Sequence, residues 1–146
     1  MTLFYTYRNG TVPPPNHYEF AIRLEKGKPA VYEFRPGYPG MGNGVELWKE
    51  TFSFSEAQRA ALYKKLVALG LTKTWQELPK PPVGGGLSVL GVTESGKTYR
   101  VPSFVTDEAA ARKLFQVVEG IVPPALVKKQ MARYEAMKKK KGPGIQ

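Results

Sequence analysis

The stretch LSVLGVTESGKTYRVP, residues 87–102, decides the fold because it supports two incompatible structures. Residues 91–98, GVTESGKT, match the phosphate-binding pattern G-x-x-x-x-G-K-[ST]. In a P-loop the lysine opens a helix whose N–H groups hold the phosphates. Here the chain continues as Tyr99-Arg100-Val101-Pro102, which alternates like a strand and brings a proline where a helix interior rejects it. The sequence therefore favours a β-hairpin over a nucleotide site.

A two-residue turn at Ser95-Gly96 gives this hairpin a consistent register. The register pairs apolar residues on one face and opposite charges beside the turn: Val92 with Tyr99, Leu90 with Val101, and Glu94 with Lys97. Too few residues follow Thr98 for the alternating strands and helices of a nucleotide-binding fold. We therefore predict no nucleotide cofactor.

Four segments of the first half alternate apolar and polar residues with the period of two that a half-buried strand requires. They are LFYTYR (3–8), HYEFAIRLE (17–25), AVYEFR (30–35) and VELWKETFSF (45–54). The turn KGKP joins the second and third as a hairpin. In the extended stretch 72–86, Trp75 and Leu78 are the expected anchors to the core, and the glycines 84–86 favour a strand lead-in over a ligand loop.

Three helices follow from capping signals and apolar stripes. The first covers 55–69, begins with a Ser55/Gln58 capping box and ends at Gly70, with a Schellman contact from Leu71 to Leu66. Its apolar stripe is Leu62, Leu66 and Leu69, and its outward residues are Arg59, Lys64 and Lys65. The second covers 107–119, is capped by Thr106 or Asp107 and ends at Gly120; its stripe is Ala111, Leu114, Phe115 and Val118. The third begins at Pro123-Pro124, with the stripe Val127, Met131 and Tyr134.

These elements predict an α+β fold, in which a mainly antiparallel sheet packs two core helices on one face and a basic C-terminal helix lies at the periphery. The chain has 146 residues, of which 42% are apolar and 23% charged, as in an ordinary globular domain. We expect one domain over residues 1–137 and a basic flexible tail over 138–146. The lack of cysteine and of any long apolar run predicts a cytoplasmic protein without a transmembrane segment.

The residues offer no convergent set of acids, bases, nucleophiles or metal ligands. His17 is the only histidine, Asp107 is the only aspartate, and the nucleophile motif G-x-S-x-G is absent. His17 is interpreted as a structural or surface histidine, and Asp107 with Glu108 as favourable charges at a helix start. We predict no catalytic, cofactor-binding or metal-binding residue.

Positive charge is the most distinctive property of the composition, with a net charge of +10. The region from Pro123 onward contributes +6, so a nucleic acid or anionic surface could bind there. The candidate polyanion-binding residues are Lys128, Lys129, Arg133, Lys138, Lys139, Lys140 and Lys141. Aromatic residues also alternate with Arg8, Arg23 and Arg35, which favours a core face over a base-stacking sheet.

Three functions follow as hypotheses. The leading one is a non-enzymatic binding module for an unknown protein partner, which uses the loops 10–16 and 37–44; its candidate contact residues are Asn16, His17, Tyr38, Met41 and Asn43. The second is a nucleic-acid accessory protein that uses the basic helix and tail. The order of strands, capped helix, hairpin and short helix also resembles a class of small proteinaceous metalloprotease inhibitors, which implies a third, inhibitory function without assigning residues to it.

Overall fold

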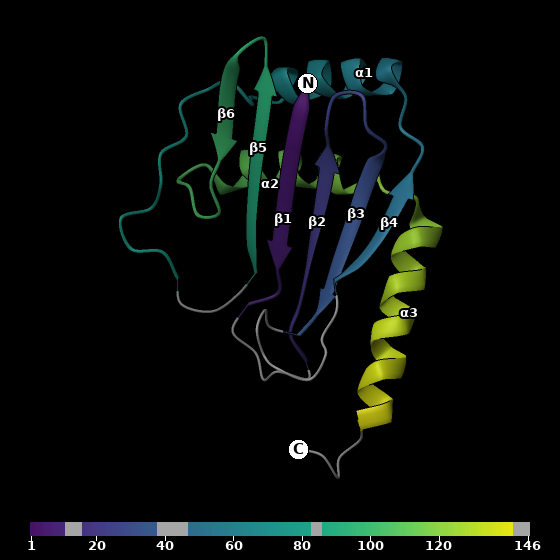
Figure 1. Ribbon diagram of the computed structural model, residues 1–146. Helices are drawn as coiled ribbons and strands as arrows, with labels where there is room; N and C mark the ends of the chain where they lie inside the picture. The colour runs from purple at the N-terminus through teal and green to yellow at the C-terminus, as the bar shows by residue number, and fades with distance from the viewer. Residues whose placement is uncertain (11–15, 38–46, 83–85, 142–146) are drawn as a thin grey trace.

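The computed structural model describes residues 1–10, 16–37, 47–82 and 86–141, without the side chains of Lys140 and Lys141. It confirms the α+β class (Figure 1). The elements are β1 (Thr2–Arg8), β2 (Tyr18–Leu24), β3 (Ala30–Pro36), β4 (Trp48–Phe52), α1 (Glu56–Ala68), β5 (Leu87–Glu94), β6 (Lys97–Val101), α2 (Glu108–Glu119) and α3 (Pro124–Lys141).

Every strand in the described part of the chain belongs to one antiparallel sheet, in the order β4-β3-β2-β1-β5-β6. The first four strands form a meander, and β1 pairs with β5 on its other side. β1, the first strand of the chain, therefore lies in the interior of the sheet, between β2 of the meander and β5 of the β5–β6 hairpin. The chain passes from the β4 edge to β5 by way of α1 (Figure 1).

The stretch 87–102 folds as the predicted hairpin. Its strands pair Val92 with Tyr99, Leu90 with Val101, and Glu94 with Lys97. Ser95 and Gly96 have φ angles of 51° and 77°, the pair of positive values that a tight two-residue hairpin turn requires. Lys97 and Thr98 open a strand, so the P-loop interpretation fails for the structural reason expected from the sequence.

Both ends of α1 form as predicted. The Ser55 side chain accepts from the Gln58 backbone N–H at 3.1 Å, and the Gln58 side chain accepts from the Ser55 N–H at 2.7 Å. At the other end, Gly70 has a φ of 104°, and the Leu71 N–H donates to the Leu66 carbonyl at 3.0 Å. This is the Schellman ending, which satisfies carbonyls that the last helical turn leaves open.

The prediction that Arg59 points outward is wrong, because the residue is only 5% exposed. Its guanidinium donates to the Glu25 carbonyl at 2.9 Å and the Lys28 carbonyl at 2.7 Å, both in the β2–β3 turn, while its Nε donates to the Phe54 carbonyl at 3.2 Å. A buried guanidinium is tolerated here because backbone carbonyls replace its water. Arg59 thus ties the start of α1 to the turn between two strands.

α2 follows its predicted apolar stripe completely, and α3 follows its stripe in part. α2 is capped by Asp107 and buries Ala111, Leu114, Phe115 and Val118, as expected. α3 buries Tyr134 and half-buries Val127 and Met131, but it also buries Gln130, which the sequence did not indicate. The helix continues to Lys141, past the boundary predicted at residue 137. Trp75 packs against the core as an anchor, and Leu78 is half-buried.

The helices lie on one side of the sheet, where α1 and α2 cross behind the strands and α3 runs along the β4 edge (Figure 1). Alternate strand residues point into this covered face and form the aromatic core, including Tyr5, Tyr32, Phe34, Trp48 and Phe52. The rings of Tyr18, Phe34 and Trp48 stack in sequence, with centroids 5.5 and 5.6 Å apart. The aromatic residues thus form a core, as predicted.

Candidate functional site

The opposite face of the sheet is the open face, which no described helix covers (Figure 1). Strand alternation places on it the residues that do not enter the core. Strands β1 to β4 each contribute one cation to it: Arg8 of β1, Arg23 of β2, Arg35 of β3 and Lys49 of β4. We name these four residues the cationic face. A fifth cation, Arg100 of β6, lies apart at the other end of the sheet and pairs with Glu77 at 3.4 Å.

Small side chains give the cationic face a hollow centre. Ala21 and Thr6 are directly opposite each other in neighbouring strands, and longer side chains surround them. The resulting depression has a volume of about 420 Å³ and is lined by Phe4, Thr6, Arg8, Glu19, Ala21, Arg23, Glu33 and Arg35, among others. A hollow with a small-residue floor and a cationic rim has the shape and charge to receive an anionic group.

One side of the rim is held by a buried carboxylate. Glu33 accepts from the Arg23 Nε at 2.7 Å and lies 3.6 Å from the Lys49 ammonium. The Glu33 side chain is only 7% exposed although it belongs to the open face, because these two cations cover it. The Arg23 guanidinium also lies 4.2 Å above the ring of Phe4, which is 40% exposed. Arg23 is therefore held by two contacts, whereas Lys49 has only the longer contact with Glu33 among the described residues.

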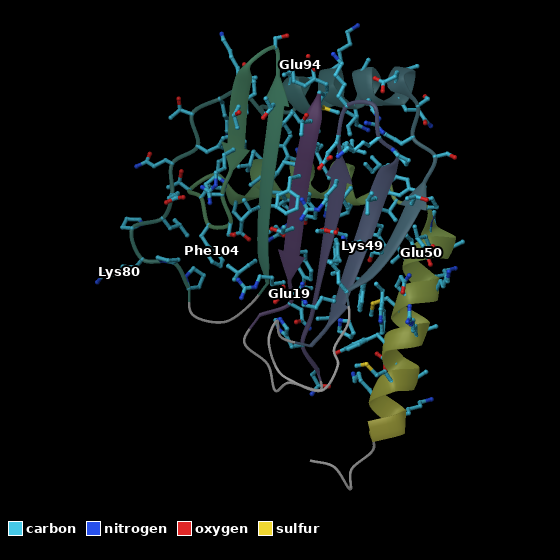
Figure 2. All side chains as sticks on the ribbon, viewed as in Figure 1. Glu19, Lys49, Glu50, Lys80, Glu94 and Phe104 are labelled. Atoms are coloured by element: carbon cyan, nitrogen blue, oxygen red, sulfur yellow. The ribbon has the colours of Figure 1, made fainter. Side chains whose placement is uncertain are left out.

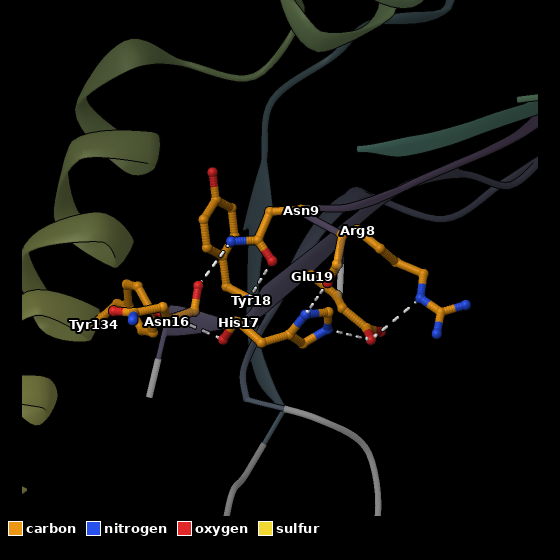
Figure 3. A network of polar contacts seen from close by, with 8 residues as sticks. Arg8, Asn9, Asn16, His17, Tyr18, Glu19 and Tyr134 are labelled. Carbon is orange, nitrogen blue, oxygen red and sulfur yellow. Dashed lines mark hydrogen bonds and ion pairs between the residues drawn. The ribbon is translucent and has the colours of Figure 1, made fainter. Parts of the chain in front are cut away.

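The other side of the rim continues into a buried histidine (Figure 3). The Glu19 carboxylate lies 3.4 Å from the Arg8 Nε and 2.9 Å from the His17 Nε2, while the His17 Nδ1 lies 2.9 Å from the Gly10 carbonyl. A carbonyl and a carboxylate both accept, so both contacts are hydrogen bonds when each ring nitrogen carries a proton. His17 is 1% exposed, so of the two predicted positions, structural or surface, it occupies a buried one.

Arg35 differs from the other three cations. It is the register neighbour of Glu19, yet it forms no ion pair or side-chain hydrogen bond with the residues that the structure describes. An Arg guanidinium presents several donors in a planar fork that matches a carboxylate or phosphate. Arg35 is therefore the cation of this face with the most bonding capacity left for a ligand.

The predicted partner-contact residues are placed only in part. Tyr38, Met41 and Asn43 lie outside the described residues. Asn16 is exposed, and its carbonyl accepts from the Asn9 side chain at 2.8 Å (Figure 3). The side chain of His17 points into the protein. It can therefore affect a bound partner only indirectly, through Glu19, which contacts both His17 and Arg8. Asn16 and the loop residues stay predictions.

Most described cations of the basic helix are engaged with the protein itself. Lys129 contacts Glu50, which Figure 2 shows beside α3, and the Arg133 guanidinium lies 4.0 Å above the ring of Trp48. Lys138 lies 3.7 Å from the Glu135 carboxylate. Lys128 and Lys139 are exposed and form no such contact with the described residues. Nucleic-acid association through this helix stays a prediction, as does any role of Lys140 and Lys141.

No group of three potential ligands that could hold a metal ion occurs among the residues the structure describes. In the same residues, every helix is too short or too polar to cross a bilayer. No protein-family model and no curated protein matches this chain. The resemblance in plan to metalloprotease inhibitors and the cytoplasmic location therefore stay predictions.

The alternation in the sequence predicts that arginines and aromatic residues occupy opposite faces of the sheet, but it does not predict which charged side chains become neighbours. The missing information was the register, which brings Arg35 beside Glu19 and Lys49 beside Glu33 from separate strands. One signal was present in the sequence: Ala21 and Thr6 are small residues at outward positions between longer outward residues, Glu19 and Arg23 in one strand and Phe4 and Arg8 in the other. Such a pair marks a depression in a sheet face.

Proposed function

We propose that the protein is a small non-enzymatic binding module that receives an anionic segment of a partner protein on its cationic face. The observation that carries this proposal is the exposed hollow surrounded by Arg8, Arg23 and Arg35. Arginine is enriched at protein interfaces, and complementary charge increases both the rate and the specificity of association. The floor of small side chains leaves room for the partner's side chains.

A protein partner fits this face better than a nucleic acid does. Four cations share the face with the carboxylates Glu19 and Glu33, so the excess of positive charge is small. A polyphosphate presents only acceptors and would be repelled by both carboxylates. A protein surface can place carboxylates against the arginines and donors against Glu19. Phe4, exposed beside Arg23, adds an apolar contact of the kind that protein interfaces use.

Binding is tested by capture from a lysate of the native host, with and without two cations of the rim: Arg8, whose only ion pair with a described residue is to Glu19 at 3.4 Å, and Arg35. The double variant Arg8→Gln and Arg35→Gln removes two charges from the rim. Its matched control, Lys64→Gln with Lys65→Gln, removes two charges from exposed positions of α1. We expect the wild type and the control to retain a common protein partner and the face variant to lose it by about tenfold.

Cross-linking followed by mass spectrometry then shows whether the retained partner contacts the face. Equal capture by the face variant, or cross-links confined to the helices, would overturn the proposal. Circular dichroism and urea unfolding check that all the variants fold alike. Loss from both double variants would indicate attraction by net charge alone and would also count against the proposed face.

A further inference from the structure

A second hollow lies on the covered side of the sheet, beside α2, and its chemistry is opposite to that of the cationic face. It is a groove of about 350 Å³. One wall is a stripe of α2 spaced by three and four residues, which puts its members on one side of the helix: Glu108, Arg112, Phe115, Gln116 and Glu119. The other wall includes Leu78, Pro82, Ser103 and Phe104, and Figure 2 shows Phe104 on the segment before α2.

The outer wall of this groove is held in place by backbone bonds. The Leu78 N–H donates to the Phe104 carbonyl at 3.0 Å, and the Thr106 N–H donates to the Gln76 carbonyl at 2.9 Å. Glu77 and Val105 form an isolated antiparallel bridge between the same two segments. A ligand would therefore meet a largely preformed site, which lowers the entropy cost of binding.

A hydrogen-bonded chain fixes the carboxylate within the groove. The hydroxyl of Tyr5, which is fully buried, donates to the Glu119 carboxylate, and the Ser88 Oγ lies 3.0 Å from the Tyr5 hydroxyl oxygen. The single proton of Tyr5 serves Glu119, so the Ser88 hydroxyl donates to Tyr5. Burial, and after it the bond to Glu119, raises the pKa of Tyr5, which keeps this donor protonated.

Glu119 also lines the groove without an oppositely charged side chain paired to it among the described residues. Arg112 pairs with Glu108 one turn away on α2, whereas Glu119 has no ion pair with any residue in the described part of the chain. Only one of its oxygens contacts Tyr5. A fixed carboxylate with a vacant oxygen, close to the rings of Phe104 and Phe115, suits a cation carried on an apolar chain. The same carboxylate repels anions.

We propose that this groove binds a primary alkylammonium group, with the ammonium on Glu119 and its methylene chain along Phe104 and Phe115. Ser88, Ser103 and Gln116 supply oxygen acceptors for the remaining ammonium protons. The group could be the side chain of a lysine in a peptide or the end of a free aliphatic diamine. This site is separate from the cationic face and does not depend on the function proposed for it.

The test is an NMR titration of the full-length protein with 1,5-diaminopentane and, separately, with Nα-acetyl-lysine methylamide. We expect saturable shifts at the amides of Ser88, Phe104 and Gln116 with at least one of them. Binding of the diamine alone assigns the site to free amines, and binding of both extends it to lysine side chains. The neutral Nε-acetylated lysine should not bind, because it lacks the charge.

Three variants decide the role of the carboxylate. Glu119→Gln keeps an acceptor for Tyr5 but removes the charge, and it should weaken binding at least about tenfold. Glu135→Gln removes a carboxylate from exposed α3 and should leave binding unchanged. Gln116→Lys, at an exposed position, should block the site with its own ammonium without affecting folding. Absence of shifts, equal binding by Glu119→Gln, or binding of the acetylated lysine would overturn the proposal.

Discussion

The two faces of the sheet are built from alternate residues of the same strands, yet they differ in what holds them together. On the covered face, rings pack ring to ring, as Phe34 does against Tyr18, Trp48 and Tyr134. On the open face, long charged side chains pair across strands, as Arg23 does with Glu33. Burial of rings on the covered face therefore provides most of the stability of this fold, while the side chains of the open face are accessible to other molecules.

Truncation of one phenylalanine on each face tests this division most strongly. Phe34 is fully buried, so Phe34→Ala should lower the free energy of unfolding by about 3–5 kcal/mol through lost burial and a cavity. Phe4 is 40% exposed, so Phe4→Ala should cost below about 1 kcal/mol, mainly the contact with Arg23. Urea unfolding at neutral pH measures both, and similar losses would refute the division.

Alkaline pH should destabilise the covered face selectively. Burial raises the pKa values of Tyr5, Tyr18, Tyr32 and Tyr134 above the ordinary value of about 10, that of Tyr134 to about 12. The unfolded chain loses these protons first, so stability is complete below pH 10 and falls as the pH rises. Each tyrosine still neutral in the folded state contributes a slope of about 1.4 kcal/mol per pH unit.

Urea midpoints measured from neutral pH to pH 11, with tyrosinate absorbance as the second signal, check this slope. Tyr32→Phe should reduce it, because that position then has no proton to lose. A midpoint that stays constant up to pH 11 would contradict the expected linkage.

The smallest expected change in the free energy of unfolding concerns Gln130, a polar residue on the covered side of the sheet. Gln130 is fully buried, and its side-chain oxygen has no hydrogen-bond partner among the described residues, while its amide lies 3.4 Å from Glu50. Gln130→Met should therefore raise the free energy of unfolding by about 1 kcal/mol. Gln76→Met, at an exposed position, is the control and should change it little. A loss of stability at position 130 would show that the contact with Glu50 outweighs the unsatisfied oxygen.

Local patterns in the sequence predicted the elements well because the signals were short-range. The capping box at Ser55, the Gly70 ending and the turn at Ser95-Gly96 each depend on neighbours within a few residues. Arg59 and Gln130 were missed because their burial depends on distant partners, such as the β2–β3 turn for Arg59. A charged residue in a helix reads as solvent-facing until those partners are known.

Only the outward position of the candidate site's arginines was predictable from the sequence, and their neighbours were not. Alternation indicated that Arg8, Arg23 and Arg35 point away from the core, but strand order and register decide which charges become neighbours. The groove beside α2 was harder to predict, since it joins Tyr5 to Glu119 across 114 residues. No local pattern encodes a contact of that separation.

The arginine that ties α1 to the β2–β3 turn has a consequence for how the chain folds. Its three carbonyl acceptors exist in the right places only when that turn has formed and the chain before the helix has arrived. Docking of α1 before the hairpin would bury an unsatisfied guanidinium, which is costly. Arg59 therefore acts as an order-imposing constraint: it couples a helix to a hairpin about 30 residues away, so that the two gain and lose structure as one cooperative unit.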